Sequence, residues 1–463
     1  MAAANAGLAA GVAGVTITPD RPMHLQGYER GPSTGTLDPL EARAIVFDDG
    51  STRAGIVSAD VIGLDTLSVQ RIRAVAEKET GIPSDHIMAT CSHTHSGPAV
   101  QTLGRLPVDE DYLHALEQQL GQAVARAARA MRPVTLGVGE GQVDLNVNRR
   151  RRTPDDTIMR ANPGGAVDKR VRVLRIDPAD ASEAPGTLGG HPLPQVDPIS
   201  VLFSYACHAT TKGRENHRFS GDYPGAARRV IENVYRSSSA KTRGGTTALF
   251  LPGCFGNLRP DLLHPDGSFR GSTDHELTVL GRLLGSEVAQ VAEHIVGEAV
   301  AEIAVARREV SLPYGPAPDR AALHAALGDP RRGPWAQTML DQLDQEGSLP
   351  TADTAEVQVM RIGRHWLVTT PGETMLEIGQ SIERGLADLH LAEPERGDMT
   401  LALGYTNGSV GYLCTASSMF EGGYEPATAY TGYLRPAPFA PQVETVLIDT
   451  ALDLARELGP TRT

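Results

Sequence analysis

The sequence predicts an α/β protein with a mixed β-sheet core flanked by helices and carrying loop insertions. Strand-like and helix-like segments alternate along almost all of its 463 residues, which is typical of helices packed on a substantial sheet. Apolar residues make up 40% of the chain and charged residues 21%, so the chain can bury a large core and is not intrinsically disordered. Its 49 glycines and 32 prolines supply many turns without making the composition low in complexity.

The elements follow one another in a regular order. Apolar runs bounded by turn residues predict strands at residues 43–47, 54–59, 87–91, 199–205, 248–251, 366–369 and 401–404. Apolar residues at helical spacing predict helices at residues 67–79, 110–131, 277–298 and 443–458, and Pro133 ends the second of them. Two stretches rich in Pro and Gly, residues 179–198 and 313–334, are interpreted as surface insertions. Because no internal repeat divides the chain, we expect a single domain over residues 1–463.

The charge and the cysteines restrict the partners and the compartment. Lys and Arg number 43 against 56 Asp and Glu, a net charge of −13, so the chain lacks the basic footprint of a nucleic-acid-binding protein. No stretch reaches the roughly 18 apolar residues that a membrane span requires, and the N-terminus has no basic region of a secretory signal. The 4 cysteines lie far apart, which argues against a disulfide framework. We expect a soluble, cytoplasmic protein, and the sequence leaves a homo-oligomer open.

Three histidines follow predicted strands. His93 and His95 come just after the strand at 87–91, and side chains two residues apart in an extended chain point to the same side. The pair could be hydrogen-bonded loop histidines, but the end of a strand is also where α/β sheets present ligand-binding groups. His208 follows the strand at 199–205 in the same way.

A carboxylate occupies a matching position. Glu373 follows the strand at 366–369 and opens a helix, where an acidic side chain is favourable against the helix dipole and needs no further role. The same position makes it a candidate ligand. Together with His93 and His208, and with His95 nearby, it forms the nitrogen and oxygen set expected of catalytic zinc with one open position. Asp222 either caps the helix that it opens, the simpler interpretation, or joins this site.

Two more loops after strands carry candidate residues. The glycine-rich segment 249–260 could offer backbone N–H groups at Gly256 and Asn257 to a substrate oxyanion. The loop at 422–430 carries Tyr424 and Tyr430 in a chain with only 5% aromatic residues. Either phenol could pack against neighbours, bind a metal or donate to an oxyanion.

Together these motifs resemble the catalytic domain of the neutral/alkaline, non-lysosomal ceramidase family. The matching segments are residues 11–19, 91–98, 148–150, 205–210, 220–225, 253–260, 371–373 and 422–430, in family order over about the whole chain. The resemblance implies an N-acyl-amide hydrolase with one zinc ion (Zn2+) per chain, held by two histidines, a glutamate and a tyrosine. Carried onto this sequence, the metal ligands are His93, His208, Glu373 and Tyr424, and His95 is an essential neighbour. We assign Tyr430 to catalysis.

Three departures separate the chain from that pattern. The family's larger members continue into a C-terminal immunoglobulin-like domain, which we do not expect here, and most are secreted or membrane-associated. An essential serine of the family is replaced by Arg259, which either binds a carboxylate or other anion of the substrate or pairs with Asp261 at the surface. Phe420 and Tyr424 compete for the family's tyrosine position, and only Tyr424 has the oxygen that a ligand needs.

We therefore expect a zinc-dependent amidohydrolase that cleaves an N-acyl amide of a small or anionic substrate rather than membrane ceramide. His95 would act as the acid/base, and Arg259 would bind the substrate and assist catalysis. Two alternatives stay open. One is a zinc-dependent ester or lactone hydrolase, or a tailoring enzyme for acyl transfer or cyclisation. The other is a non-catalytic binding protein on the same scaffold.

Overall fold

The computed structural model describes residues 7–28, 30–104, 106–179, 186–188, 191–193, 196–236, 245–300 and 302–460. Its central feature is an eight-stranded sheet. In spatial order the strands are β14 (Thr247–Pro252), β12 (Ser200–Tyr205), β9 (Arg170–Pro178), β6 (Arg132–Gln142), β1 (Ala9–Thr16), β3 (Glu41–Asp48), β4 (Arg53–Ala59) and β5 (Ile87–Cys91). The sheet is mixed, because β4 with β5 and β12 with β14 run parallel while the other neighbours run antiparallel.

A second, four-stranded sheet packs against the first. It consists of β16 (Ile303–Pro313), β17 (Ala352–Ile362), β18 (His365–Thr369) and β20 (Thr400–Leu403), of which β18 and β20 are parallel. Ile56 and Leu202 of the large sheet share one buried cluster with Met360 and Leu367 of the smaller sheet. The main core therefore lies between the two sheets.

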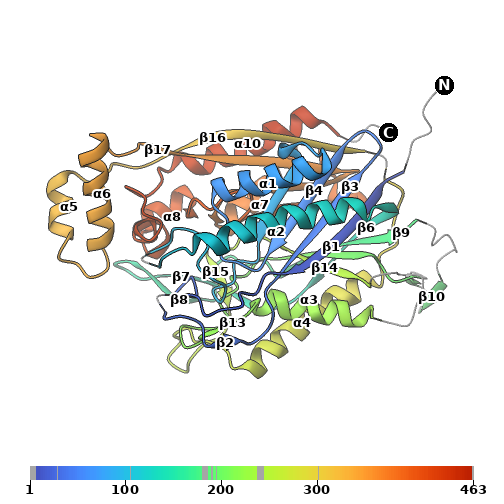
Figure 1. Cartoon of the computed structure of the whole chain (residues 1–463), viewed down its shortest axis with the longest axis horizontal. Helices are drawn as coiled ribbons and strands as arrows, with labels where there is room; N and C mark the ends of the chain where they lie inside the picture. The colour runs from blue at the N-terminus through green and yellow to red at the C-terminus, as the bar shows by residue number, and fades with distance from the viewer. Residues whose placement is uncertain are drawn as a thin grey trace.

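Helices cover the outer faces of both sheets (Figure 1). On the large sheet lie α1 (Thr66–Thr80), α2 (Glu110–Arg129), α3 (Asp222–Val234) and α4 (Asp274–Ala292), and on the smaller sheet lie α7 (Leu376–Asp388) and α10 (Gln442–Leu458). Alternating residues of each strand serve the two faces: Ile45 joins the core between the sheets, whereas Ala44 and Val46 pack under α2. The order of layers is helix, sheet, sheet, helix, which is the mixed α/β class that the sequence predicts.

The remaining described elements are short or peripheral. They are β2 (Gly35–Thr36), β7 (Asn146–Arg152), β8 (Thr157–Asn162), β10 (Gly186–Leu188), β11 (His191–Leu193), β13 (Arg218–Phe219), β15 (Leu258–Pro260), β19 (Glu373–Thr374), β21 (Tyr412–Leu413), α5 (Arg320–Ala326), α6 (Gly333–Glu346), α8 (Ala416–Glu421) and α9 (Tyr424–Ala427). Three 3₁₀ turns lie at Ser84–His86, Pro394–Arg396 and Ala429–Thr431. None of the helices in the described ranges is both long and apolar enough to span a bilayer.

The expected elements differ from the observed ones mainly at their ends. The helix expected at 277–298 begins at Asp274, because Thr273 and Glu276 form a capping box, and it ends at Ala292. The segment 313–334 leads from β16 into α5 and α6, which project at one end of the molecule (Figure 1). Within 179–198, β10 pairs with β11, and most of that stretch lies outside the described residues.

Candidate metal centre and active site

Each candidate metal ligand lies just past the carboxyl end of a strand. His93 follows β5, His208 follows β12, and Glu373 follows β18 and opens β19. Isolated bridges between Thr90 and Thr406 and between Gly253 and Leu403 join the strand ends of the two sheets. The loops that carry the ligands therefore meet where α/β sheets commonly bind ligands.

Three of the side chains named by the sequence converge on one point. The Nε2 atoms of His93 and His208 lie 3.3 Å and 2.9 Å from Oε2 of Glu373. The two imidazole rings meet edge-on, with their centroids 4.9 Å apart. All three side chains are buried. His93 has a φ of 58°, in the left-handed region that residues other than glycine rarely adopt, so the surrounding fold holds this histidine in a strained conformation.

Backbone carbonyls determine which ring nitrogen carries the proton. Nδ1 of His93 lies 2.5 Å from the carbonyl oxygen of Ile62, and Nδ1 of His208 lies 2.8 Å from those of Phe255 and Leu258. Because a carbonyl oxygen only accepts, each Nδ1 must donate, and each Nε2 then presents a lone pair. Burial, reinforced by Arg149, lowers the pKa of His208 to about 3, which keeps its ring neutral.

This donor set fits a divalent metal ion. Burial alone would raise the pKa of Glu373, but the neighbouring imidazoles of His93 and His208 outweigh burial and hold that pKa well below the usual value, so the carboxylate is ionised. Two imidazole lone pairs and a carboxylate oxygen thus face one another at close range, which is unfavourable without a cation between them. Imidazoles whose other nitrogen donates to a carbonyl are also the usual form of histidine metal ligands.

A different tyrosine from the two named by the sequence reaches this centre. The hydroxyl of Tyr433, a buried residue, donates to Oε1 of Glu373. Tyr424 instead packs edge-on against Tyr412 and is 43% exposed. Tyr430 packs edge-on against Trp335 of α6, with ring centroids 5.6 Å apart. The only sequence signal for Tyr433 is its place in the same loop, three residues after Tyr430.

His95 lies beside His93 but faces a different set of neighbours. Its Nε2 is 3.3 Å from Nε2 of His93, and its ring is 5.2 Å from that of Tyr28. The nitrogens of His93, His95 and His208 lie within 4.8 Å of one another, so these three could also hold a metal. Two donor sets therefore share His93 and His208, one completed by His95 and the other by Glu373 with Tyr433.

Two arginines of β7, Arg149 and Arg150, point inward rather than to solvent. Nη1 of Arg149 lies 3.4 Å from Nε2 of His208, and its Nη2 donates to the hydroxyl of Tyr412 at 2.8 Å. Glu425 joins Arg149 to Arg150, with one carboxylate oxygen 2.7 Å from each guanidinium. All three charged residues are buried. In the sequence, only the place of these two arginines in the family-like segment 148–150 indicates a site role.

The glycine-rich loop supports the centre through Gly256 and Asn257. The N–H of Gly256 donates to the carbonyl of Thr374 at 2.8 Å, and a Cβ on Gly256 would lie 2.4 Å from the carbonyl oxygen of Glu373. The side chain of Asn257 donates to Glu377 at 2.8 Å and accepts from the N–H of Leu376 at 3.0 Å. The N–H of Gly256 and the side chain of Asn257 are thus engaged in positioning Glu373 and the start of α7.

Arg259 does not pair with Asp261. Among the described residues it forms no ion pair, and its guanidinium stacks on Phe269, 4.1 Å from the ring centroid. Its Nε is buried without a hydrogen-bond partner. The interpretation that Arg259 pairs with Asp261 at the surface is therefore wrong, and the Nε of Arg259 is left as an unused donor.

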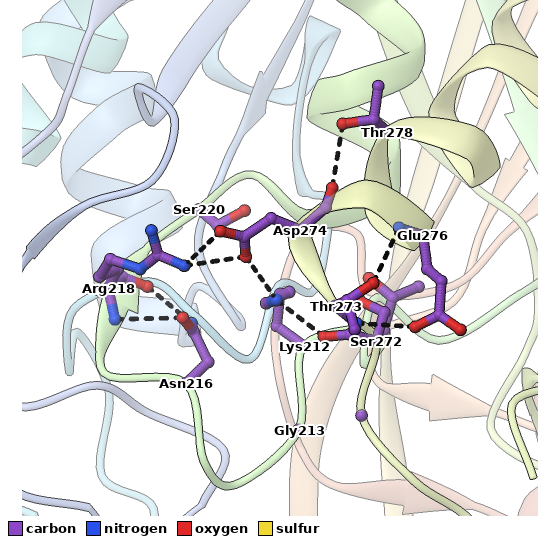
Figure 2. A network of polar contacts seen from close by, with 12 residues as sticks. Lys212, Gly213, Asn216, Arg218, Ser220, Ser272, Thr273, Asp274, Glu276 and Thr278 are labelled. Carbon is purple, nitrogen blue, oxygen red and sulfur yellow. Dashed lines mark hydrogen bonds and ion pairs between the residues drawn. The ribbon is translucent and has the colours of Figure 1, made fainter.

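The segment after His208 is anchored at the start of α4 (Figure 2). Nζ of Lys212 donates to the carbonyl of Ser272 at 2.8 Å and to Asp274 at 2.9 Å, and Arg218 also donates to Asp274. Asp222 accepts from the backbone N–H of Lys212 at 3.0 Å and thereby holds this segment. Gly221, and not Asp222, is the N-cap of α3, but the Asp222 carboxylate also accepts from the N–H of Tyr223 at 2.7 Å in the first turn of that helix.

Comparison with known proteins agrees with this architecture. The crystal structure of neutral ceramidase from Pseudomonas aeruginosa superposes with a TM-score of 0.74 at 18% identity, covering 99% of this chain and 76% of that one. A ceramidase complexed with C2 gives a TM-score of 0.72 at 19% identity, covering 99% of this chain and 77% of that one. At these identities the likeness shows the fold, and it confirms the predicted fold class.

Sequence comparison adds the family. Neutral ceramidase A of Dictyostelium discoideum is 25% identical over 266 residues, which are 53% of this chain and 35% of that protein. The match thus spans well under two thirds of that relative's length. The family described as neutral/alkaline non-lysosomal ceramidase, N-terminal, matches residues 10–275, more than half of this chain. The chain therefore belongs to the neutral/alkaline non-lysosomal ceramidase family.

Proposed function

We propose that this protein is a zinc-dependent amidohydrolase that cleaves an N-acyl amide bond of a small or anionic substrate. The observation that carries the proposal is the convergence of the His93 and His208 Nε2 lone pairs on the Glu373 carboxylate, at 3.3 Å and 2.9 Å. A set of imidazoles and one carboxylate suits zinc. Membership of a ceramidase family makes an N-acyl amide the first substrate class to test.

We assign the metal to His93, His208, Glu373 and Tyr433, with Tyr433 in place of Tyr424. Tyr433 is buried, and its hydroxyl already contacts the carboxylate of Glu373. Zinc bound there would supply an activated water at neutral pH and polarise the substrate carbonyl.

The other polar side chains of the site bind and orient the substrate. Arg149 supplies a positive charge held in place by Glu425 and Tyr412, which favours the negative charge that develops on the scissile carbonyl oxygen. His95 is the only other imidazole in the described cluster of three, and it lies at the partly exposed side of the centre. We assign it the transfer of a proton to the leaving nitrogen.

Zinc content measured in four proteins tests this assignment. After dialysis against limiting zinc, wild type and His95→Ala should each hold one zinc per chain, whereas His208→Ala should hold none. His114→Ala removes an exposed histidine of α2 and serves as the control. Loss of zinc from His95→Ala would favour the set of three histidines and end the acid/base role of His95.

Activity is measured on the same proteins as release of the carboxylic acid from an N-acyl amide. His95→Ala should retain zinc and lose about 100-fold or more in turnover, in the usual range for removing a general acid/base. Wild-type protein without zinc or without amide cleavage would refute the proposed function.

A further inference from the structure

We propose that positively charged side chains beside His95 bind an anionic group on the amine half of the substrate, so that the substrate is an N-acyl amino acid. The inference rests on the proposed amide hydrolysis and names its substrate class. The residues are Tyr28, Arg30, Arg214 and Arg259, called here the Tyr28 cluster.

Arg259 lies beside Tyr28 and carries a donor, its Nε, that the described part of the protein does not use. Its Nε is buried without a hydrogen-bond partner, and no ion pair neutralises it there. Burial lowers the pKa of Arg259 below the ordinary arginine value, although the phenol of Tyr28 acts in the opposite direction. Because a guanidinium presents its N–H groups in a planar fork that matches a carboxylate, an incoming carboxylate would satisfy both the charge and the donors.

Arg30 adds a second buried charge that no described carboxylate neutralises by an ion pair. The residue is 6% exposed, and its guanidinium donates to the backbone carbonyls of Asn216, at 2.5 Å, and of His95. Its Nε also has no partner. Burial lowers the pKa of Arg30 to about 10, which leaves it charged at neutral pH. Carbonyl dipoles stabilise such a cation only in part, so Arg30 contributes positive potential next to His95.

Tyr28 connects these charges to the centre. The guanidinium carbons of Arg30 and Arg214 lie 5.2 Å and 5.8 Å from the centroid of its ring, which is a favourable position for a cation. The same ring lies 5.2 Å from that of His95. Among the described acidic side chains, the one whose charge raises the pKa of Arg30 is Glu215, which is exposed. Three arginines against this one acid leave the cluster positively charged.

The position of the cluster decides which half of the substrate it meets. Arg149, on the His208 side, already pairs with Glu425, whereas the Tyr28 cluster lies on the His95 side. If His95 protonates the leaving nitrogen, that nitrogen lies next to His95 and the amine half lies against the cluster. In an N-acyl amino acid, the carboxylate is separated from the nitrogen by a single carbon. With this short spacing, the nitrogen can lie next to His95 while the carboxylate lies next to the arginines of the Tyr28 cluster.

The test compares two substrates that differ only in this charge, N-octanoylglycine and N-octanoylglycinamide, with octanoate release as the readout. Wild-type protein should prefer the acid, measured as the ratio of the two kcat/KM values. Arg259→Leu should lower that ratio by about 10- to 100-fold, the usual effect of removing a hydrogen bond between charged groups. Arg152→Leu removes an arginine whose side chain is 73% exposed, and it should leave the ratio unchanged.

Binding supplies a readout that needs neither metal nor turnover. Calorimetric titration of metal-free wild type with N-octanoylglycine should show binding that is at least tenfold weaker in Arg259→Leu. If that variant does not fold, as judged by circular dichroism, Arg259→Lys replaces it and should also lower the ratio, because lysine lacks the fork of donors.

The outcomes separate the inference from the proposed function. Equal cleavage of both glycine substrates by wild type would overturn the inference and leave the amidase standing. Cleavage of neither would refute the amidase, and the titration would then decide on the anion site alone. Preference for octanedioic acid monomethylamide, whose carboxylate lies on the acyl half, would show that the cluster faces the other side of the scissile bond.

Discussion

Replacing Glu425 by glutamine tests whether the buried charges around Arg149 hold the site together. The carboxylate accepts from Arg149 and Arg150 at 2.7 Å each. All three residues are buried: Arg149 is 4% exposed, Arg150 5% and Glu425 4%. Glu425→Gln removes the negative charge and turns one acceptor oxygen into an amide donor that faces a guanidinium donor. Since breaking a buried pair on one side costs about 3–5 kcal/mol, we expect a loss of about 4 kcal/mol in the free energy of unfolding.

The assay is urea unfolding of metal-free protein, followed by tryptophan fluorescence, because Trp335 and Trp366 are both buried. Removing the metal keeps altered zinc affinity out of the comparison. Glu421→Gln is the matched control: its side chain is 27% exposed and lies 3.4 Å from Arg150, so its loss should stay below about 1 kcal/mol. If the two variants lose the same stability, the charge of Glu425 is not what stabilises this region, and the reasoning fails.

Two further predictions concern Gly27 and His365. Gly27 has a φ of 98°, and a Cβ there would lie 2.3 Å from Nδ1 of His95, whereas Gly81 has a φ of 72° with open space around it. Gly27→Ala should therefore displace His95 and lower turnover at least tenfold, while Gly81→Ala should cost only about 1 kcal/mol of stability; equal turnover in both variants would contradict this. Burial lowers the pKa of His365 to about 4, so the neutral ring favours the folded state. This stability is present above the unfolded value near pH 6.5 and is lost as the pH falls towards 4, a total of roughly 3 kcal/mol. His365→Gln should flatten that part of the pH dependence of the unfolding free energy, and an unchanged slope would exclude His365 as its source.

The sequence was informative about the metal centre wherever a ligand follows directly from a strand. His93, His208 and Glu373 each come a few residues after an apolar run, and loops after strands are where α/β proteins commonly bind ligands. The strands β5 and β12 are not neighbours in the large sheet, and β18 belongs to the smaller sheet, so only the packing of the two sheets brings the three side chains together. The proposed ligand set itself stays a prediction until its zinc content is measured.

Loop residues were harder to assign. Tyr424, Tyr430 and Tyr433 lie in one loop with similar surroundings in the sequence, and all have the same hydroxyl. Which of them reaches Glu373 depends on packing between distant segments. Trp335 of α6 holds Tyr430 at the periphery. Gly411 leaves room for the Tyr433 ring, because a Cβ at position 411 would lie 3.1 Å from the nearest atom of that ring.

The sequence by itself determined the α/β class, the positions of several of its main helices and strands, and the strand ends at which His93, His208 and Glu373 stand. These features follow from hydrophobic periodicity, which is a local property of the chain. Only the tertiary structure decided that Arg149 pairs with Glu425, that the Gly256 N–H and the Asn257 side chain support Glu373 and the start of α7, and that Arg259 has no acidic partner among the described residues. Each of these outcomes depends on contacts between segments far apart in the chain, for which periodicity carries no information.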